Sequence, residues 1–242
     1  MAFREAEPMM HDDDTLPFTE ETLDQLYAEV SDPEGITLAR LEALIDAFGT
    51  RDRAPMDTQS YREGRKPWKK LRDEIVPVQH FLASTYPADV RVRFPLDDQP
   101  PDAWLKVGDA PPVGIEVTGA LARASIEVGR SLAGGGAVPG FIGLQDDASS
   151  AAFAQARARQ RVTNSRKNVE RTIDTAIGSR LVAKDHEKYT GHILLVTAPT
   201  GSSPYRKPEA IKQALGEKAK QLPFAEIYVL DTSRRKPPIR LK

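Results

Sequence analysis

The chain has 242 residues, with 34 lysines and arginines, 35 aspartates and glutamates, and no cysteine. This length allows one large domain, or a domain of ordinary size with a small accessory part. Hydrophobic residues make up 40% and charged residues 29%, which is typical of a soluble globular protein with a core. The lack of cysteine excludes a disulfide scaffold, a thiol nucleophile and a cysteine-based metal site. No apolar run approaches the roughly 20 residues that span a bilayer, and no apolar signal region follows Met1, so we expect a cytoplasmic protein without a membrane partner.

Charge is distributed unevenly along the chain. Residues 1–60 contain four basic and fifteen acidic residues, a balance of −11 that leaves +10 for residues 61–242. A basic body indicates a polyanionic partner such as nucleic acid. Two oppositely charged parts that pack against each other would give the same distribution, so charge alone leaves both interpretations open.

The N-terminal quarter predicts an acidic tail and a small helical hairpin. The tail has no hydrophobic periodicity and is expected to be disordered. Thr19, followed by two glutamates, is placed to cap a helix that runs through Val30. Thr37 is placed to cap a second helix closed by Gly49, and residues 50–66 are expected to be a linker. The predicted divisions, in the order tail, hairpin and main domain, are residues 1–17, 18–56 and 62–242.

From Trp68 onward the hydrophobic spacing predicts an α/β domain. A helix is followed by three short strands, a glycine-rich segment expected to be mobile, a long helix, a buried strand, another helix and a last strand. The final strand–helix–strand unit favours a parallel pair. We therefore predict a mixed central sheet with an αβββαβ core flanked by helices. The expected ranges in chain order are 68–82, 90–94, 102–107, 114–118, 119–148, 149–183, 192–197, 208–221 and 225–230.

Side-chain alternation in the three strands predicts one apolar face and one polar face. On the polar face, Asp102 and Glu116 lie on adjacent strands beside several cations. A pair of carboxylates with room for water is what Mg²⁺ prefers, above all when a phosphate completes its ligands. Each also has an ordinary explanation, since Asp102 could be a turn residue and Glu116 a solvated outer-face residue. The polar face comprises Arg91, Arg93, Asp102, Lys106, Glu116 and Thr118.

Pro101-Asp102, thirteen intervening residues and then Glu116-Val117-Thr118 resemble the motif of the PD-(D/E)XK nuclease superfamily. The order of elements over residues 62–197 is also similar to the αβββαβ core of that family. The resemblance implies a Mg²⁺-dependent or Mn²⁺-dependent endonuclease. It further implies that Asp102, Glu116 and the Val117 carbonyl bind the metal, joined by a glutamate on the first helix, where Glu74 stands.

The lysine that the family usually carries two residues after the glutamate is replaced here by Thr118. Some members carry this lysine on the following helix, and Lys167, three residues before Glu170, could face the site from there. Lys106, on the same strand as Asp102, is the other candidate. Lys167 and Glu170 also fit an ordinary ion pair on a helix surface.

Four arginines are candidates for holding nucleic-acid phosphates without reading sequence. A charged helix face turned to solvent would carry the same residues. The leading hypothesis is a metal-dependent hydrolase that cuts nucleic acid, with DNA as the expected substrate. The alternative is a non-catalytic nucleic-acid-binding or assembly module, in which the hairpin contacts a protein partner or a second copy. The four arginines are Arg91, Arg93, Arg159 and Arg166.

Overall fold

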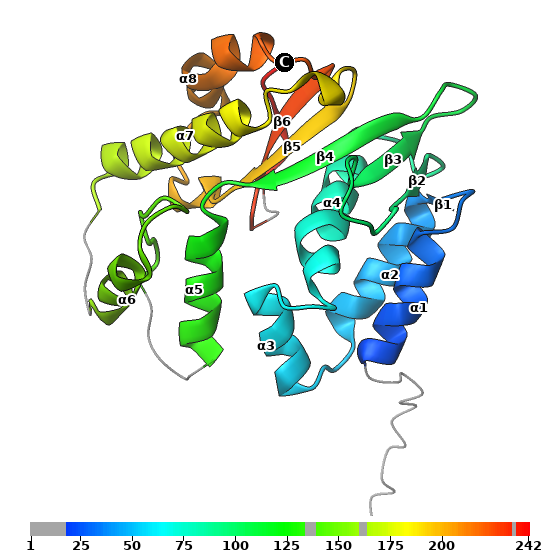
Figure 1. The fold of residues 1–242 in the computed structure, drawn as a ribbon, viewed down its shortest axis with the longest axis horizontal. Helices are drawn as coiled ribbons and strands as arrows, with labels where there is room; N and C mark the ends of the chain where they lie inside the picture. The colour runs from blue at the N-terminus through cyan, green and yellow to red at the C-terminus, as the bar shows by residue number, and fades with distance from the viewer. Residues whose placement is uncertain (1–17, 134–138, 160–163, 234–235) are drawn as a thin grey trace, which may run out of the picture.

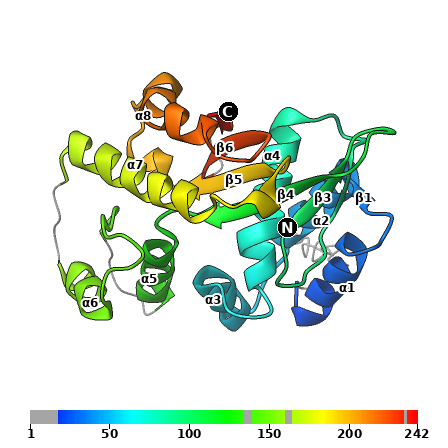
Figure 2. The ribbon, with the colours of Figure 1, turned by 45° about the horizontal axis from the view of Figure 1, so that its top comes forward.

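The computed structural model describes residues 18–133, 139–159, 164–233 and 236–242. Within these residues the chain forms a mixed α/β fold, with helices on both faces of a seven-stranded sheet (Figures 1 and 2). The predicted fold class is thus confirmed. The tail predicted to be disordered, residues 1–17, lies outside the described residues. Among the helices that the structure describes, none combines the length and apolarity needed to cross a membrane.

The elements follow the predicted order, with β1, α3, α5 and β7 in addition. The α-helices are α1 Glu20–Val30, α2 Leu38–Thr50, α3 Pro55–Glu63, α4 Val76–Thr85, α5 Ala122–Ala133, α6 Ser150–Ala158, α7 Arg166–Ala183 and α8 Pro208–Lys220. The π-helical turn η1 Leu71–Ile75 leads into α4, and the 3₁₀ turns are η2 Glu187–Tyr189 and η3 Thr200–Ser202. The strands are β1 Ile36–Thr37, β2 Arg91–Arg93, β3 Ala103–Lys106, β4 Val113–Gly119, β5 Ile193–Ala198, β6 Glu226–Asp231 and β7 Ile239–Arg240.

The strands lie side by side in chain order from β1 to β7. Strands β2 to β4 form an antiparallel meander, and β1 pairs antiparallel with β2 at its edge. Strands β4, β5 and β6 are parallel, and β7 closes the other edge in the antiparallel sense. Parallel neighbours need long crossover connections, which here contain α5 to α7 before β5 and α8 before β6. The predicted meander and the predicted parallel pair are both confirmed.

Two apolar cores cover the two faces of the sheet, because successive side chains of a buried strand point to opposite faces. In β5, Ile193 and Leu195 join a core shared with α1, α2 and α4. Leu194 and Val196 join a second core shared with α7 and α8. The continuous apolar run of this strand is therefore explained by burial on both sides.

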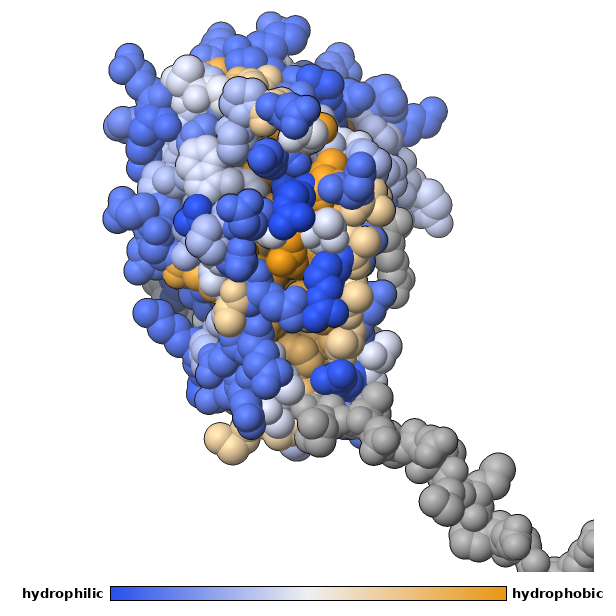
Figure 3. All heavy atoms as spheres, turned by 90° about the vertical axis from the view of Figure 1, so that its right-hand side faces the viewer, coloured by the Kyte–Doolittle hydropathy of each residue, from blue (hydrophilic) through white to orange (hydrophobic). Residues whose placement is uncertain are grey.

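The N-terminal hairpin is part of the first core. Leu23 and Leu41, from its two helices, belong to the same buried cluster as Trp68 and Phe81. Strand β1, between the two helices, pairs with β2 and extends the sheet. Figure 3 looks onto the side where Figure 1 places α1, α2 and β1, and hydrophilic side chains make up most of that surface, with hydrophobic ones in a narrow strip. The hairpin therefore covers core on one side and presents a polar surface on the other.

Tyr27 ties this hairpin to the main domain. Its hydroxyl donates to the Pro67 carbonyl at 2.6 Å and accepts from the Leu71 N–H at 3.1 Å. We expect Tyr27→Phe to lower the free energy of unfolding by about 1–3 kcal/mol, because both partners lose a hydrogen bond in a partly buried place. Urea unfolding followed by circular dichroism measures this change. Tyr205→Phe is the matched control, since Tyr205 is 82% exposed, and an equal loss in both variants would contradict the assignment.

Three sequence-based predictions were wrong. The expected linker contains α3, which Pro55 begins and Gly64 closes in a left-handed conformation, φ 62°. The glycine-rich segment contains α5, whose first N–H groups, those of Ala122 and Arg123, donate to the Asp146 carboxylate. Residues 134–138, within that segment, lie outside the described part of the chain. The single long helix is instead two, α6 and α7, each capped by a serine at its start.

Candidate active site

Two carboxylates meet where β3 begins beside the middle of β4. Ala103 pairs with Ile115, so the next position of the same antiparallel register sets Asp102 opposite Glu116. Directly opposed residues point to the same face, with their Cβ atoms roughly 4.5–5.5 Å apart. Asp102 is held by one carboxylate oxygen, Oδ2, which accepts from the Val117 N–H at 2.7 Å. Within the described residues its other oxygen makes no hydrogen bond, and Asp102 lines a cleft.

Glu116 is buried, with only 5% of the residue exposed. Its Oε1 accepts from Lys184 Nζ at 2.5 Å, and the same ammonium lies 3.3 Å from the Tyr189 hydroxyl. Its Oε2 is buried without a hydrogen-bond partner. Burial disfavours the charged form of Lys184, but the hydrogen bond and charge of Glu116 outweigh it and raise the lysine pKa above its ordinary value. One oxygen of Glu116 is thus paired with an ammonium group, and the other has no partner among the described residues.

Glu74, in η1, brings a third carboxylate near Asp102. Burial raises the pKa of Asp102 to about 6, and the charge of Glu116 adds to the effect. Burial raises the pKa of Glu74 to about 7, with the charge of Asp102 adding to it. Lys70 lies 3.1 Å from Glu74 and offsets part of this repulsion. Buried carboxylates that raise one another's pKa are a common feature of functional sites.

Asp102 and Glu116 fit a divalent cation. Each offers an oxygen that the rest of the described chain does not use, and hard oxygen ligands are what Mg²⁺ and Mn²⁺ take. Across the described ranges no group of three or more histidine, aspartate or glutamate side chains is placed to hold a metal. The ligands available to a divalent ion are therefore the two carboxylates, a backbone carbonyl such as that of Val117, and water. Glu74 is coupled to Asp102 by charge and does not join them in such a group.

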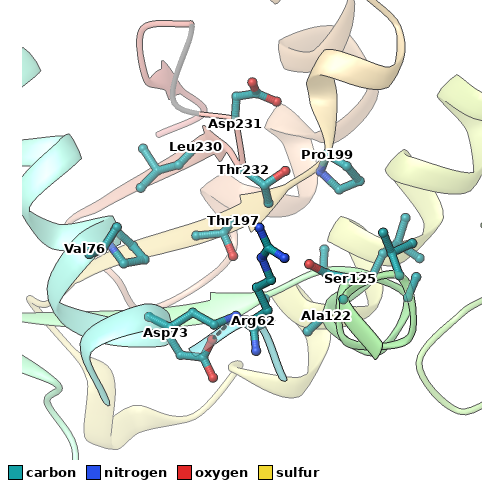
Figure 4. Close-up of a pocket in the computed structure, with 18 of the residues that line it drawn as sticks. Arg62, Asp73, Val76, Ala122, Ser125, Thr197, Pro199, Leu230, Asp231 and Thr232 are labelled. Atoms are coloured by element: carbon teal, nitrogen blue, oxygen red, sulfur yellow. Dashed lines mark ion pairs between the residues drawn. The ribbon is translucent and has the colours of Figure 1, made fainter. Parts of the chain in front are cut away.

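The cleft that Asp102 lines has a volume of about 750 Å³. It lies at the carboxyl ends of β4, β5 and β6, the usual place for ligands in open α/β sheets. Figure 4 shows Val76 and Asp73 on one side, Ala122 and Ser125 of α5 on the other, and Arg62 of α3 between them. Thr118, at the position of the family lysine, also lines it. Asp102 thus opens onto a space that can hold a substrate, while Glu116, buried beside it, does not line the cleft.

The two lysines predicted from sequence lie away from the carboxylates. Lys167 is exposed in the first turn of α7, about 25 Å along the helix axis from Lys184 at the C-cap. Its supposed partner Glu170 accepts instead from Arg166 and from Ser203, at 2.8 Å each. Lys106 is exposed at the opposite end of β3 from Asp102, roughly 13 Å away. Neither lysine is brought to the site.

The predicted phosphate-binding arginines are also dispersed. Arg91 donates to the carbonyls of Glu34 and Gly35, at 2.9 and 2.5 Å, and so holds the turn before β1. Arg166 is paired with Glu170 at the start of α7. Arg93 and Arg91 line a second, shallower hollow of about 330 Å³. Arg159, at the C-cap of α6, is exposed. These four arginines do not surround Asp102.

Sequence reasoning missed Lys184 and the cations of the cleft, Arg62, Lys69 and Arg72. A signal for Lys184 was present. A crossover helix runs antiparallel to the strands it joins, so its last turn returns to the start of the next strand, where Leu194 pairs with Glu116. That connection favours a lysine at the end of the helix over one at its beginning.

The chain was compared with protein-family models, with curated proteins and with solved structures, and none of the three comparisons gave a match.

Proposed function

We propose that this protein is a divalent-metal-dependent nuclease that hydrolyses phosphodiester bonds of nucleic acid, with DNA as the expected substrate. The observation that carries the proposal is the pairing of Asp102 with Glu116 across β3 and β4, with the buried Oε2 of Glu116 left unpaired. Burying a carboxylate oxygen without a partner is unfavourable in free energy, and a bound cation would remove that penalty. The αβββαβ order around this pair, and its resemblance to the PD-(D/E)XK family, support the same activity.

The residues of this chain take distinct roles in the proposed reaction. Asp102 and Glu116 hold the ion, and the Val117 N–H fixes the orientation of the Asp102 carboxylate. A divalent ion would supply positive charge to the phosphate and lower the pKa of an attacking water. Lys184 adds a fixed ammonium beside the same carboxylates, where it stabilises negative charge that develops on the phosphate.

The direct test is cleavage of circular DNA. Supercoiled plasmid and circular single-stranded DNA are incubated with the full chain and Mg²⁺ or Mn²⁺, and again with EDTA. We expect cleavage of at least one substrate with the metal and none with EDTA, visible as nicked, linear or shorter products on a gel. The absence of cleavage of both circles with either metal would overturn the proposal.

A second candidate is a non-catalytic nucleic-acid-binding module on the same fold. Two observations favour it. The Lys184 ammonium already neutralises Glu116. Thr118 stands at the position where the family usually has its lysine. Binding of DNA that is unaffected by EDTA, without cleavage, would support this candidate. Absence of both binding and cleavage would favour the assembly module, in which the N-terminal hairpin contacts a protein partner or a second copy.

Lys184 gives a prediction that tests its proposed role in cleavage. We expect Lys184→Gln to lower the cleavage rate by about 10²-fold, because a charge-stabilising group is lost while a donor to Glu116 remains. Lys167→Gln is the matched control on the same helix and is expected to change the rate less than twofold. Initial rates at saturating Mg²⁺ measure both, and equal effects of the two substitutions would remove Lys184 from the site.

A further inference from the structure

The cleft has features that the pair of carboxylates does not use. Three cations line it, Arg62 from α3, Lys69 just before η1 and Arg72 within η1. The Arg62 side chain makes no hydrogen bond or ion pair with any residue that the structure describes. It extends into the middle of the cleft, toward Thr197 at the end of β5 (Figure 4). A free guanidinium in this position is available to a ligand phosphate.

The acidic side chains nearby do not neutralise Arg62. Asp231 accepts from the Thr200 hydroxyl at 2.8 Å and from the Gly201 N–H at 2.6 Å, and it also bonds the Ser233 hydroxyl. Asp73 lies 3.5 Å from Arg72 and is paired with it. Both carboxylates therefore have partners of their own, and the positive charge of Arg62 is left for an anion.

The side of the cleft along α5 is largely apolar. Ala122, Val128 and Leu132 line it from this helix, and Phe141 and Ile142 continue the apolar surface. Leu132 is 47% exposed. Apolar side chains left open in a cleft favour a ligand with flat apolar surfaces, and a partly buried ring such as that of Phe141 can stack on a base. One side thus suits bases while the cations suit phosphates.

The cleft is closed at the side where α3 meets α5. Gly129 of α5 packs so tightly on α3 that an added Cβ would lie 3.1 Å from the Arg62 carbonyl oxygen. Arg130 of α5 lies 3.9 Å from the buried Glu63 of α3. A cleft of about 750 Å³ that is closed at one side is of the size that takes a small ligand. The bases of a double helix are stacked inside it and are therefore unavailable to the apolar side of the cleft.

We propose that this cleft binds a single strand of nucleic acid, with a phosphate at Arg62 and a base against Phe141, and leads that strand to Asp102. The inference rests on the proposed function for the chemistry that follows binding, but the binding itself does not require cleavage. It restricts the substrate class to single strands, or to duplexes whose strands have separated.

Binding is measured with the Asp102→Asn protein in EDTA, so that cleavage plays no part. Fluorescein-labelled 12-mers of single-stranded DNA, of single-stranded RNA and of the DNA duplex are titrated by anisotropy across a salt series. We expect at least one single strand to bind tenfold or more tightly than the duplex. Arg62→Gln should weaken that binding about fivefold to tenfold and reduce the salt slope by about 0.7, the value for one phosphate contact on a single strand.

Two further variants make the test specific. Phe141→Leu keeps the apolar bulk and removes the ring, and it should weaken single-strand binding roughly tenfold through lost stacking. Arg171→Gln, at an exposed arginine of α7 that bonds Asn168, makes the same charge change as Arg62→Gln and should have less than a twofold effect. Duplex binding as tight as single-strand binding, or equal effects of Arg62→Gln and Arg171→Gln, would overturn the inference.

The two proposals fail in different ways. If no circular DNA is cut but a single strand still binds in an Arg62-dependent manner, the nuclease proposal fails and the binding inference stands. If plasmid is cut equally well by the wild-type protein and by Arg62→Gln and Phe141→Leu, the nuclease proposal stands and the binding inference fails.

Discussion

Glu116→Gln is expected to lower metal-dependent cleavage of DNA by a thousandfold or more. The substitution keeps the size of the side chain and an oxygen that can accept from Lys184 Nζ. It removes the negative charge, which a divalent ion bound by only two carboxylates needs from each of them. Initial rates on the circular substrate, measured over a range of Mg²⁺ concentrations, give the loss. Mn²⁺ binding by calorimetry should disappear together with activity.

Because Glu116 is buried, Glu116→Gln should also lower the free energy of unfolding, which substitution of a solvated residue on the outer face of the sheet would not do. Lys184, itself only 22% exposed at its side chain, is left with a neutral partner. We expect a loss of about 2 kcal/mol in unfolding free energy, the range for a hydrogen bond to a charged group, so circular dichroism must confirm the fold. Glu170→Gln is the matched control, because it removes the carboxylate partner of Arg166 in the first turn of α7. Unchanged cleavage by folded Glu116→Gln would exclude the proposed site.

Asp102→Asn is expected to abolish cleavage and, in the absence of metal, to stabilise the fold at pH 8. Asp102 has a pKa of about 6 in the folded protein against an ordinary value of 3.8, with burial as the main cause and the Glu116 charge as the second. Ionised Asp102 therefore opposes folding. A shift of this size corresponds to about 2 kcal/mol after allowance for solvent screening. Asparagine keeps an oxygen for the Val117 N–H and carries no charge.

The sign of this effect makes it depend on pH. Below about pH 4 the carboxyl is protonated in both states, and Asp102 does not oppose folding. As the pH rises from about 4 to the folded pKa of about 6, the unfolded chain gives up this proton more readily than the folded protein, so the wild type loses stability relative to the variant, and the loss is complete above that pKa. Thermal melts in EDTA at pH 5 and pH 8 should show a larger advantage of Asp102→Asn at pH 8. Mg²⁺ should raise the melting temperature of the wild type alone. Equal melting temperatures of the two proteins at pH 8 without metal would contradict this account.

Local sequence pattern was sufficient for the sheet around the site. Alternation with period two and short turns predicted strands over 102–107 and 114–118, and the structure has β3 at Ala103–Lys106 and β4 at Val113–Gly119. In an antiparallel pair joined by a short turn, register follows from the turn and from which face is apolar. The same pattern therefore also determined that Asp102 and Glu116 share a face. Strand β5 was equally predictable from its continuous apolar run.

The partners of those carboxylates were not determined by local sequence pattern, and the tertiary structure shows which residues they are. Helical periodicity tells which face of a helix is buried, but not which of its ends lies over a given strand residue, so Lys167 was chosen where packing brings Lys184. The helix α3 has only Glu63 buried and little apolar periodicity, and it is held by its contact with α5. The cleft and the free Arg62 within it arise from that contact. Contacts between elements far apart in sequence depend on how whole faces pack, and no local spacing encodes that.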